Sequence, residues 1–334
     1  MLVGTLVMFE EYYGLNEKPF AVQPDPAFLF LSDKHKQTLS RLKYSMLNRA
    51  GFTVITGGIG SGKTTLIREL MHNIEENIAV GLVSNVNFSS FTELLQWILY
   101  SFELDYKGKD KVSLFETFTD FVIENYSEGR RTVLIIDEAQ NLDPEALEQL
   151  RMLLNINVDH HQVLQLILVG QLELQETLRR PELEQFVQRV EVDFTLEPLN
   201  MAETRQYVEH RLQVAGGGKD LFTADTYPAI WRSTSGIPRL INILCGMAIT
   251  YGFADFKDHI DIDVINAVIE DKKNGFSQLE DTGFSGSGSQ IVGLATNNGH
   301  PTAISASTGL DDQSNKKNQK NLSTIEKLFL LNKE

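Results

Sequence analysis

The sequence predicts an α/β protein with a five-stranded parallel sheet, followed by a smaller part made of helices alone. Between about residues 50 and 200, five short β-rich runs alternate with longer helical patterns. Several of these runs lack the in–out alternation of a half-exposed sheet, which indicates strands buried on both faces. Repeated alternation of strand and helix implies a parallel sheet with helices on both sides. From about residue 200 to residue 275 the pattern is helical only.

The five strands are expected, in chain order, at residues 52–56, 80–84, 132–137, 164–170 and 190–196. After the third strand, apolar residues recur at spacings of three and four from Leu142 to Leu154, as on one face of a helix. Asp143 directly before Pro144 predicts where this helix begins, with aspartate as N-cap and proline at the first helical position. Breaks at 216–218 and 236–238 divide the C-terminal helical part.

The composition excludes several classes of protein. The 334 residues include 45 acidic and 30 basic side chains, and the formal net charge of −15 argues against a protein that coats nucleic acid or anionic lipid by bulk charge. Cys245 is the only cysteine, which excludes an intramolecular disulfide and a cysteine-rich zinc site. It lies in an apolar helical stretch, so we expect a small core residue. No apolar run approaches the roughly 18 residues of a membrane-spanning helix.

The two ends of the chain differ from the rest. Residues 276–334 are rich in Gly, Ser, Thr and Asn and predict a flexible tail, because such a segment cannot bury enough apolar area to offset chain entropy. The last dozen residues, 323–334, fit either a frayed end or a short amphipathic docking helix. A second methionine, Met8, leaves two interpretations of residues 1–7: a start-site extension or a short N-terminal arm.

The clearest functional motif follows the first strand. It satisfies the pattern G-x-x-x-x-G-K-[ST] in full, and with the next residue it comprises Gly57, Gly58, Ile59, Gly60, Ser61, Gly62, Lys63, Thr64 and Thr65. The glycines let the backbone turn tightly and aim successive N–H groups at an anion, and the following helix adds the positive end of its dipole. We expect Lys63 to reach the β- and γ-phosphates of ATP and Thr64 to ligate Mg²⁺. The sequence therefore predicts a nucleotide-binding phosphate loop.

Two adjacent acids, Asp137 and Glu138, end the third strand. Because the carboxyl ends of parallel strands share one edge of the sheet, both acids are expected beside the phosphate loop. Asp137 would hold Mg²⁺ through its water shell, and Glu138 would orient the attacking water or accept its proton. The pair therefore predicts Mg²⁺-dependent hydrolysis of ATP. The alternative is a strand end with two solvated acids.

Further segments match one family in order along the chain. IIDEAQNLDPEALEQLRML contains the two acids, and the other segments are YYGL at 12–15, KPF at 18–20, PDP at 24–26, LS at 31–32 with His35, LILVGQ at 166–171 and GIPRLIN at 236–242. Over about residues 8–255 the chain thus resembles the AAA+ ATPases, and among them the ExeA/GspA secretion ATPases. MshM-type pilus ATPases and exopolysaccharide- or exosortase-associated ATPases belong to the same branch.

This resemblance implies a P-loop NTPase αβα sandwich and a helical lid. Residues 1–199 would form the N-terminal segment and the AAA+ nucleotide-binding domain, residues 200–275 the lid, and residues 276–334 the tail. A chain of this family energises or regulates the assembly of a cell-envelope system, such as type II-like secretion, a pilus or exopolysaccharide export.

The resemblance also implies roles for several polar residues. Gln171, just after the fourth strand, stands where the family senses the γ-phosphate, and Arg239 stands at the second sensor. Arg189, before the fifth strand, is our choice for the arginine finger, with Arg179 and Arg180 as rivals. A finger that reaches a neighbouring subunit implies a homo-oligomer. The alternative for each arginine is a surface salt bridge.

Other side chains permit two interpretations. An N-terminal group of aromatic residues would either form a wall beside the adenine or pack the N-terminal segment onto the core; it comprises Tyr12, Tyr13, Phe20, Phe28 and Phe30. His35 has the same two interpretations. His160 and His161 lie in a polar loop without a ligand partner nearby, which argues against a metal site.

The biological task has alternatives too. ExeA carries a transmembrane helix and a peptidoglycan-binding domain after the ATPase, whereas a polar tail follows here. We therefore expect a cytoplasmic protein that reaches the inner membrane through a membrane-bound secretion, pilus or polysaccharide-export partner. One alternative is a DNA-dependent ATPase of the MuB/TniB transposition-helper kind, although the acidity argues against direct nucleic-acid binding. Another is a nucleotide-gated assembly switch with little turnover.

Overall fold

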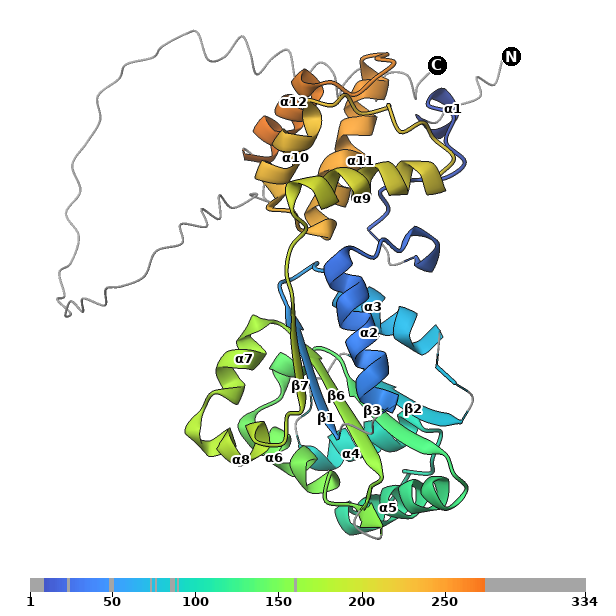
Figure 1. The fold of residues 1–334 in the computed structure, drawn as a ribbon, viewed down its shortest axis with the longest axis vertical. Helices are drawn as coiled ribbons and strands as arrows, with labels where there is room; N and C mark the ends of the chain where they lie inside the picture. Colours follow the sequence, from blue (N-terminus) through green and yellow to red (C-terminus); the bar gives the residue numbers. More distant parts are fainter. Residues whose placement is uncertain are drawn as a thin grey trace, which may run out of the picture.

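The computed structural model describes residues 9–22, 25–47, 51–72, 74–75, 77–84, 88, 90–158 and 161–273. The predicted tail at 276–334, with its last dozen residues, and residues 1–7 lie outside this part of the chain. Figure 1 shows two regions: a sheet with its covering helices, and above it a group of helices formed mainly by C-terminal residues.

Five parallel strands form the central sheet in the order β2-β3-β6-β1-β7. Their bounds are β1 (Phe52–Gly57), β2 (Ile78–Val83), β3 (Arg131–Ile136), β6 (Leu164–Gly170) and β7 (Val192–Leu196). The predicted α/β fold is confirmed, and no strand bound differs from its expected position by more than two residues. The connection from β1 runs toward one edge of the sheet and the connection from β6 toward the other. Such a reversal opens a crevice at the carboxyl ends of these strands, where ligands bind in α/β sheets.

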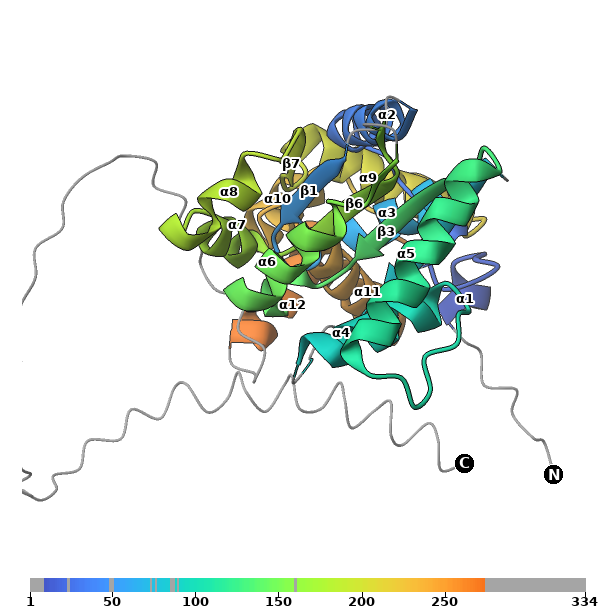
Figure 2. The same cartoon turned by 90° about the horizontal axis from the view of Figure 1, so that it is seen from below.

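Helices cover both faces of this sheet. On one face lie α2 (Asp33–Leu47) and α3 (Lys63–His72), which pack against Val133 and Ile135 of β3. The intervening residues Leu134 and Ile136 point to the other face. That face is covered by α4 (Phe91–Ser101), α5 (Lys111–Ser127), α6 (Pro144–Leu153), α7 (Leu172–Leu178) and α8 (Glu184–Val187). Figure 2 shows α2 on one side of the strands and α4 to α6 on the other.

Helix α6 begins as its sequence predicts. The side chain of Asp143 accepts a hydrogen bond from the backbone N–H of Ala146 over 2.7 Å, and Pro144 takes the first helical position. A short hairpin follows, β4 (Asn157–Val158) with β5 (His161–Gln162). It was not predicted, because strands of two residues show no alternation that a sequence pattern could reveal.

The C-terminal helices are α9 (Met201–Val214), α10 (Thr226–Thr234), α11 (Pro238–Ala254) and α12 (Ile262–Lys273). Asn200 and Glu203 start α9 with a capping box, in which each side chain accepts a backbone N–H of the other residue. Cys245 is fully buried in the core of these helices, as expected. Among the described residues, no helix is long and apolar enough to cross a bilayer.

The N-terminal segment packs on the C-terminal helices. It contains α1 (Phe9–Tyr12) and the 3₁₀ helix η1 (Pro26–Phe28). Leu15, Phe20 and Phe28 are buried in the same hydrophobic core as α9 to α12, so packing of the aromatic group is observed. The division at residue 200 remains a prediction, but by these contacts residues 9–22 and 25–30 belong with the helical region that follows it.

Candidate functional site

A cavity of about 450 Å³ lies where the phosphate loop, the N-terminal segment and the C-terminal helices meet. Its lining includes most of the predicted site residues, from positions far apart in the sequence: Ile59, Gly60, Ser61, Gly62, Lys63, Thr64, Thr65, Glu138, Gln171 and Arg239. Gly57, Gly58 and Asp137 lie just behind this lining, and Arg189 does not line it.

The phosphate loop joins β1 to α3, which begins at Lys63. Its turn requires glycine at Gly60 and Gly62, whose φ angles are +76° and +98°. The ammonium of Lys63 donates hydrogen bonds to the carbonyls of Gly57, over 2.8 Å, and Gly58, over 3.0 Å. Burial lowers the pKa of Lys63, and the negative charges of Glu138 and Asp137 oppose this shift. A cation held only by carbonyl oxygens can turn toward an anionic ligand.

A second observation indicates that the loop suits a phosphate ligand. In the described part of the chain, the buried hydroxyl of Ser61 has no hydrogen-bond partner. A buried hydroxyl without a partner costs stability, so a ligand that supplies one is favoured. A backbone loop with glycine turns, a buried ammonium and an unsatisfied hydroxyl is the donor set that phosphate oxygens need.

A carboxylate and a hydroxyl meet at one edge of the cavity. The hydroxyl of Thr64 donates to Oδ2 of Asp137 over 3.0 Å, and the backbone N–H of Glu138 donates to Oδ1 over 2.9 Å. Burial raises the pKa of Asp137, and these two hydrogen bonds oppose the shift. Hydroxyl and carboxylate oxygens suit Mg²⁺, so the pair fits a magnesium site shared with a nucleotide.

Glu138 points into the cavity from a left-handed backbone conformation, with φ 56° and ψ 34°. Oε2 of Glu138 accepts hydrogen bonds from Nε2 of Gln140 over 2.6 Å and from Nε2 of Gln171 over 3.4 Å. The structure therefore brings Glu138 and Gln171 together, as their predicted roles require. Sequence reasoning missed Gln140, whose only signal is its place two residues after Glu138.

The predicted arginines lie in different surroundings. Arg239 is exposed at the start of α11, and its backbone N–H donates to the carbonyl of Gly60 over 3.3 Å. The helix thus begins directly on the phosphate loop. Arg189 is half-buried after α8, whereas Arg179 and Arg180 are exposed at the end of α7. The assignment of Arg189 as the arginine finger, with Arg179 and Arg180 as rivals, stays a prediction.

One end of the cavity has an aromatic wall. Phe28 and Phe30 line it, so the packed N-terminal segment also borders the cavity. Beside them lies the buried Arg211 of α9, whose guanidinium donates to the carbonyls of Pro19 and Ala21 and lies 4.8 Å from the centre of the Phe28 ring. A flat, largely apolar end with a few polar groups suits a nucleobase. Arg211 was not predicted, because a lone arginine on a helix gives no sign of burial.

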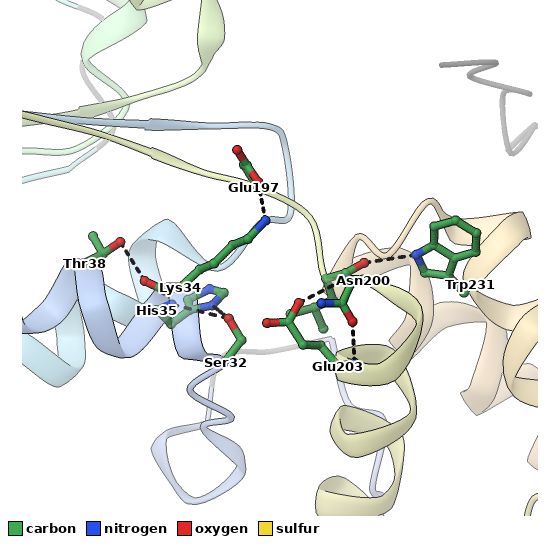
Figure 3. Close-up of polar contacts among 9 residues, drawn as sticks. Ser32, Lys34, His35, Thr38, Glu197, Asn200, Glu203 and Trp231 are labelled. Atoms are coloured by element: carbon green, nitrogen blue, oxygen red, sulfur yellow. Dashed lines mark hydrogen bonds and ion pairs between the residues drawn. The ribbon is translucent and has the colours of Figure 1, made fainter. Parts of the chain in front are cut away.

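His35 joins the N-terminal segment to the phosphate loop. Its Nδ1 lies 2.7 Å from the hydroxyl of Ser32, and its Nε2 lies 3.3 Å from the carbonyl of Ser61. Because a carbonyl can only accept, Nε2 carries the proton and Nδ1 accepts from Ser32, a contact that Figure 3 shows. Burial lowers the pKa of His35, against the hydrogen bond to Ser61.

The linker from β7 to α9 is fixed from both sides. An ion pair joins Lys34 of α2 to Glu197 in the linker, and Nε1 of Trp231 donates to the carbonyl of Leu199 over 3.1 Å. Figure 3 shows these contacts on either side of Asn200, where α9 begins. The C-terminal helices are therefore positioned over the phosphate loop by contacts with both regions.

The sequence argues against a metal site at His160 and His161. Of these two residues, His160 lies outside the described part of the chain. Within the described residues, no group of three His, Cys, Asp or Glu side chains is arranged to hold a metal ion. His161 instead lies in β5 with its ring 6.4 Å from that of Tyr126.

Comparisons with known proteins show which families this chain is similar to. Residues 46–178 match the AAA domain family. The chain is 38% identical over 248 residues to the general secretion pathway protein A of Aeromonas hydrophila, a match that covers 74% of this chain and 45% of that protein. The chain therefore spans less than half the length of this relative. The resemblance read from the sequence is confirmed.

Solved structures of low sequence identity share the fold. The ORC2 protein of Aeropyrum pernix, in its ADPNP–ADP complexes, matches with a TM-score of 0.58 and 17% identity over 76% of this chain and 71% of its own. Drosophila ORC bound to DNA matches with a TM-score of 0.59 and 13% identity over 82% and 72%, respectively. Cdc6p of Pyrobaculum aerophilum matches with a TM-score of 0.58 and 16% identity over 74% and 70%.

Proposed function

We propose that this chain, which matches the AAA domain family over residues 46–178 and is similar to general secretion pathway protein A, hydrolyses ATP to energise or regulate the assembly of a cell-envelope system. The observation behind this proposal is the single cavity that Lys63, Thr64, Glu138 and Gln171 line together, with Asp137 directly behind Thr64. A phosphate loop, a hydroxyl–carboxylate pair and a second acid at one strand edge are the parts that transfer of a phosphoryl group to water requires.

The residues have distinct roles in this proposal. The loop and Lys63 bind the phosphates, while Thr64 and Asp137 would hold Mg²⁺, which when bound neutralises charge on the phosphate oxygens. Glu138 orients a water and accepts its proton as the water oxygen bonds to the γ-phosphorus. The bond to the β–γ bridging oxygen breaks, and ADP and phosphate leave. Gln171 and Arg239 stabilise the γ-phosphate oxygens.

We propose a homo-oligomer in which Arg189 completes the neighbour's site, with Arg179 and Arg180 as rivals. Mixing inactive Arg189→Ala with inactive Glu138→Gln subunits tests this. A shared site restores part of the activity, because some interfaces then combine an intact Glu138 with an intact arginine. If both variants assemble and the mixture stays inactive, Arg189 is not the finger.

Hydrolysis itself is tested with the purified full chain. Lys63→Ala is expected to lose both the rise in melting temperature caused by ATP and the release of phosphate. Glu138→Gln should keep the rise in melting temperature and lose phosphate release at least a hundredfold, because it removes the proton acceptor and leaves the phosphate loop intact. Phosphate release by Lys63→Ala at the wild-type rate would contradict the proposal. Binding without turnover in the wild type would favour the nucleotide-gated switch.

The envelope role rests on the relative's description as a secretion-pathway protein. We propose that the chain works in the cytoplasm and reaches the membrane through a partner. Deleting its gene and measuring protein secretion, piliation and surface polysaccharide should reveal a defect that the wild type restores and Lys63→Ala does not. Intact envelope functions, together with salt-sensitive stimulation of the ATPase by DNA, would favour a transposition-helper role instead.

A further inference from the structure

Gln140 is hydrogen-bonded to two residues that line the cavity, although it does not line the cavity itself. It belongs to the 3₁₀ helix η2 (Ala139–Asn141), which follows β3, whereas Gln171 follows the neighbouring strand β6. Glu138 and Gln171 line the cavity, but Gln140 does not. Its half-buried amide nevertheless bonds to both of them.

The geometry fixes the orientation of this amide. Oε1 of Gln140 accepts the backbone N–H of Gln171 over 2.9 Å. A backbone N–H can only donate, so the atom that faces it must be the amide oxygen. The NH₂ group of Gln140 therefore faces Glu138, and it donates to Oε2 over 2.6 Å. Swapping the two ends of the amide would break both bonds.

Backbone features bring the three residues this close. Glu138 has a φ of 56°, a left-handed conformation that is uncommon for residues other than glycine and clusters at functional sites. At position 170, a Cβ atom would lie 2.8 Å from Cδ2 of Leu174 and 3.1 Å from Oε1 of Gln140, so glycine gives η2 room to lie closely against the end of β6. The contact is thus built into the backbone of both strand ends.

We propose that Gln140 is a positioning residue for ATP hydrolysis, which links the end of β6 to the carboxylate of Glu138. This inference rests on the proposed function. When the side chain of Gln171 turns to the γ-phosphate, Oε2 of Glu138 loses that donor and keeps the bond to Gln140. The carboxylate then gains a vacant acceptor site for water while a neutral amide still holds its orientation.

The test compares Gln140→Ala with Gln149→Ala in the full chain. Gln149 is a matched control, because its Nε2 also donates to a glutamate, Glu145, over 2.9 Å on the remote helix α6. Gln140→Ala should lower kcat about tenfold or more, as loss of an outer partner of a reacting group does. KM and the rise in melting temperature caused by ATP should change less than about twofold. Gln149→Ala should behave as the wild type.

Two further readouts separate positioning from general damage. Gln140→Glu keeps the length of the side chain and an acceptor for Gln171 but replaces the NH₂ donor to Glu138 with a carboxylate, so it should lose kcat at least as far as Gln140→Ala while ATP binding is kept. In ¹⁵N-labelled protein, the side-chain NH₂ signals that vanish in Gln140→Ala identify Gln140. They should shift when a non-hydrolysable ATP analogue and Mg²⁺ bind, whether or not the protein turns over.

The outcomes distinguish this inference from the proposed function. If the wild type hydrolyses ATP and Gln140→Ala keeps kcat within twofold, only the inference fails. A kcat loss accompanied by an equal loss of ATP binding would mean structural damage and would also overturn it, as would NH₂ signals that do not shift. If the wild type binds ATP without hydrolysing it, the proposed function fails first and leaves no reaction for Gln140 to assist.

Discussion

The hydroxyl of Thr64 donates a hydrogen bond to Oδ2 of Asp137 over 3.0 Å, which joins the first turn of α3 to the end of β3 at the edge of the cavity. Oδ1 of Asp137 accepts the backbone N–H of Glu138, so both oxygens have a partner. Burial still raises the pKa of Asp137 above its ordinary value. Ionisation of Asp137 is therefore less favourable in the folded chain than in the unfolded chain.

This relationship predicts that Asp137→Asn raises the melting temperature at pH 7.5 in the absence of nucleotide. A raised pKa in the folded state means that the ionised group destabilises the fold at every pH above that pKa. Asparagine removes the charge and can still accept from Glu138 and donate to Thr64. We expect a rise of about 2–4 °C, since about 1 kcal/mol corresponds to such a shift in a domain of about 150–250 residues. Differential scanning calorimetry measures it.

The same measurement at lower pH is the control for Asp137→Asn. The gain should shrink as the pH falls through the folded-state pKa of Asp137 toward the ordinary carboxyl pKa, because the wild-type carboxyl then becomes neutral in both states. The variant should also lose the extra stabilisation that Mg²⁺ adds to ATP, because it removes an anionic oxygen near the proposed metal. A lower melting temperature than the wild type at pH 7.5 would contradict the prediction.

Protonation of His35 should reduce the stability of the fold at acidic pH. Burial lowers the pKa of His35 below its ordinary value, so the unfolded chain binds this proton more tightly than the folded one. Stability should therefore fall as the pH drops through about 6.5, the ordinary pKa of histidine, and the loss should level off below the folded-state pKa. His35→Gln should make the fall in melting temperature between pH 7.5 and pH 5.5 shallower. The exposed His72→Gln is the control, and an equal effect of both variants would count against this role.

Removal of the Arg211 side chain should lower the stability of the fold markedly. The residue is 6% exposed, and its guanidinium donates to the carbonyls of Pro19 and Ala21 and to the hydroxyl of Tyr207. Arg211→Met keeps the length of the side chain but removes the donor to the carbonyl of Pro19 and to the hydroxyl of Tyr207, whereas the carbonyl of Ala21 still accepts from the amide of Asn242. Each buried acceptor that loses its donor costs about 1–3 kcal/mol. Urea unfolding should show a free energy of unfolding lower by at least about 2 kcal/mol. Arg205→Met, which removes an exposed ion pair on the same helix, is the control and should cost about 1 kcal/mol or less.

The strands and the phosphate loop could be predicted because their signals are local. A buried parallel strand such as residues 164–170 is a continuous apolar run, and the loop residues lie next to one another in the chain. The meeting of Thr64 with Asp137 also followed from the sequence, since parallel strands end at one edge. In each of these cases the arrangement depends on sequence pattern and topology alone.

Gln140 and Arg211 could not be predicted because their roles depend on distant partners. Arg211 bonds to Pro19, 192 positions away, and nothing near it in the sequence marks it as buried. Gln140 meets Gln171 across two strand ends, where Glu138 takes a left-handed conformation and residue 170 lacks a side chain. These conditions arise from tertiary packing, which a periodic pattern does not encode.

Gly236 lies in the turn between α10 and α11, and we expect its substitution to be strongly destabilising. Its φ is +71°, and a Cβ atom there would lie 1.8 Å from the carbonyl oxygen of Leu199, in the linker that leads into α9. Gly236→Ala therefore adds a backbone clash to conformational strain. Gly129→Ala is a matched control, because Gly129 also has a positive φ, +76°, but nothing lies within 4 Å of the added carbon. The control should lose about 1–2 kcal/mol in unfolding free energy from strain alone.

Gly236→Ala should lower the free energy of unfolding by well over twice as much as Gly129→Ala. It should also weaken ATP binding. The reason is that α11 begins at Pro238, and the backbone N–H of Arg239 bonds to Gly60 of the phosphate loop. Moving the backbone of residue 236 away from Leu199 shifts this helix start relative to the loop. Calorimetric titration with ATP would measure the change in affinity, which Gly129→Ala should leave unaltered. Equal losses of stability in the two variants, with unchanged ATP affinity in both, would mean that the lid tolerates movement at this contact.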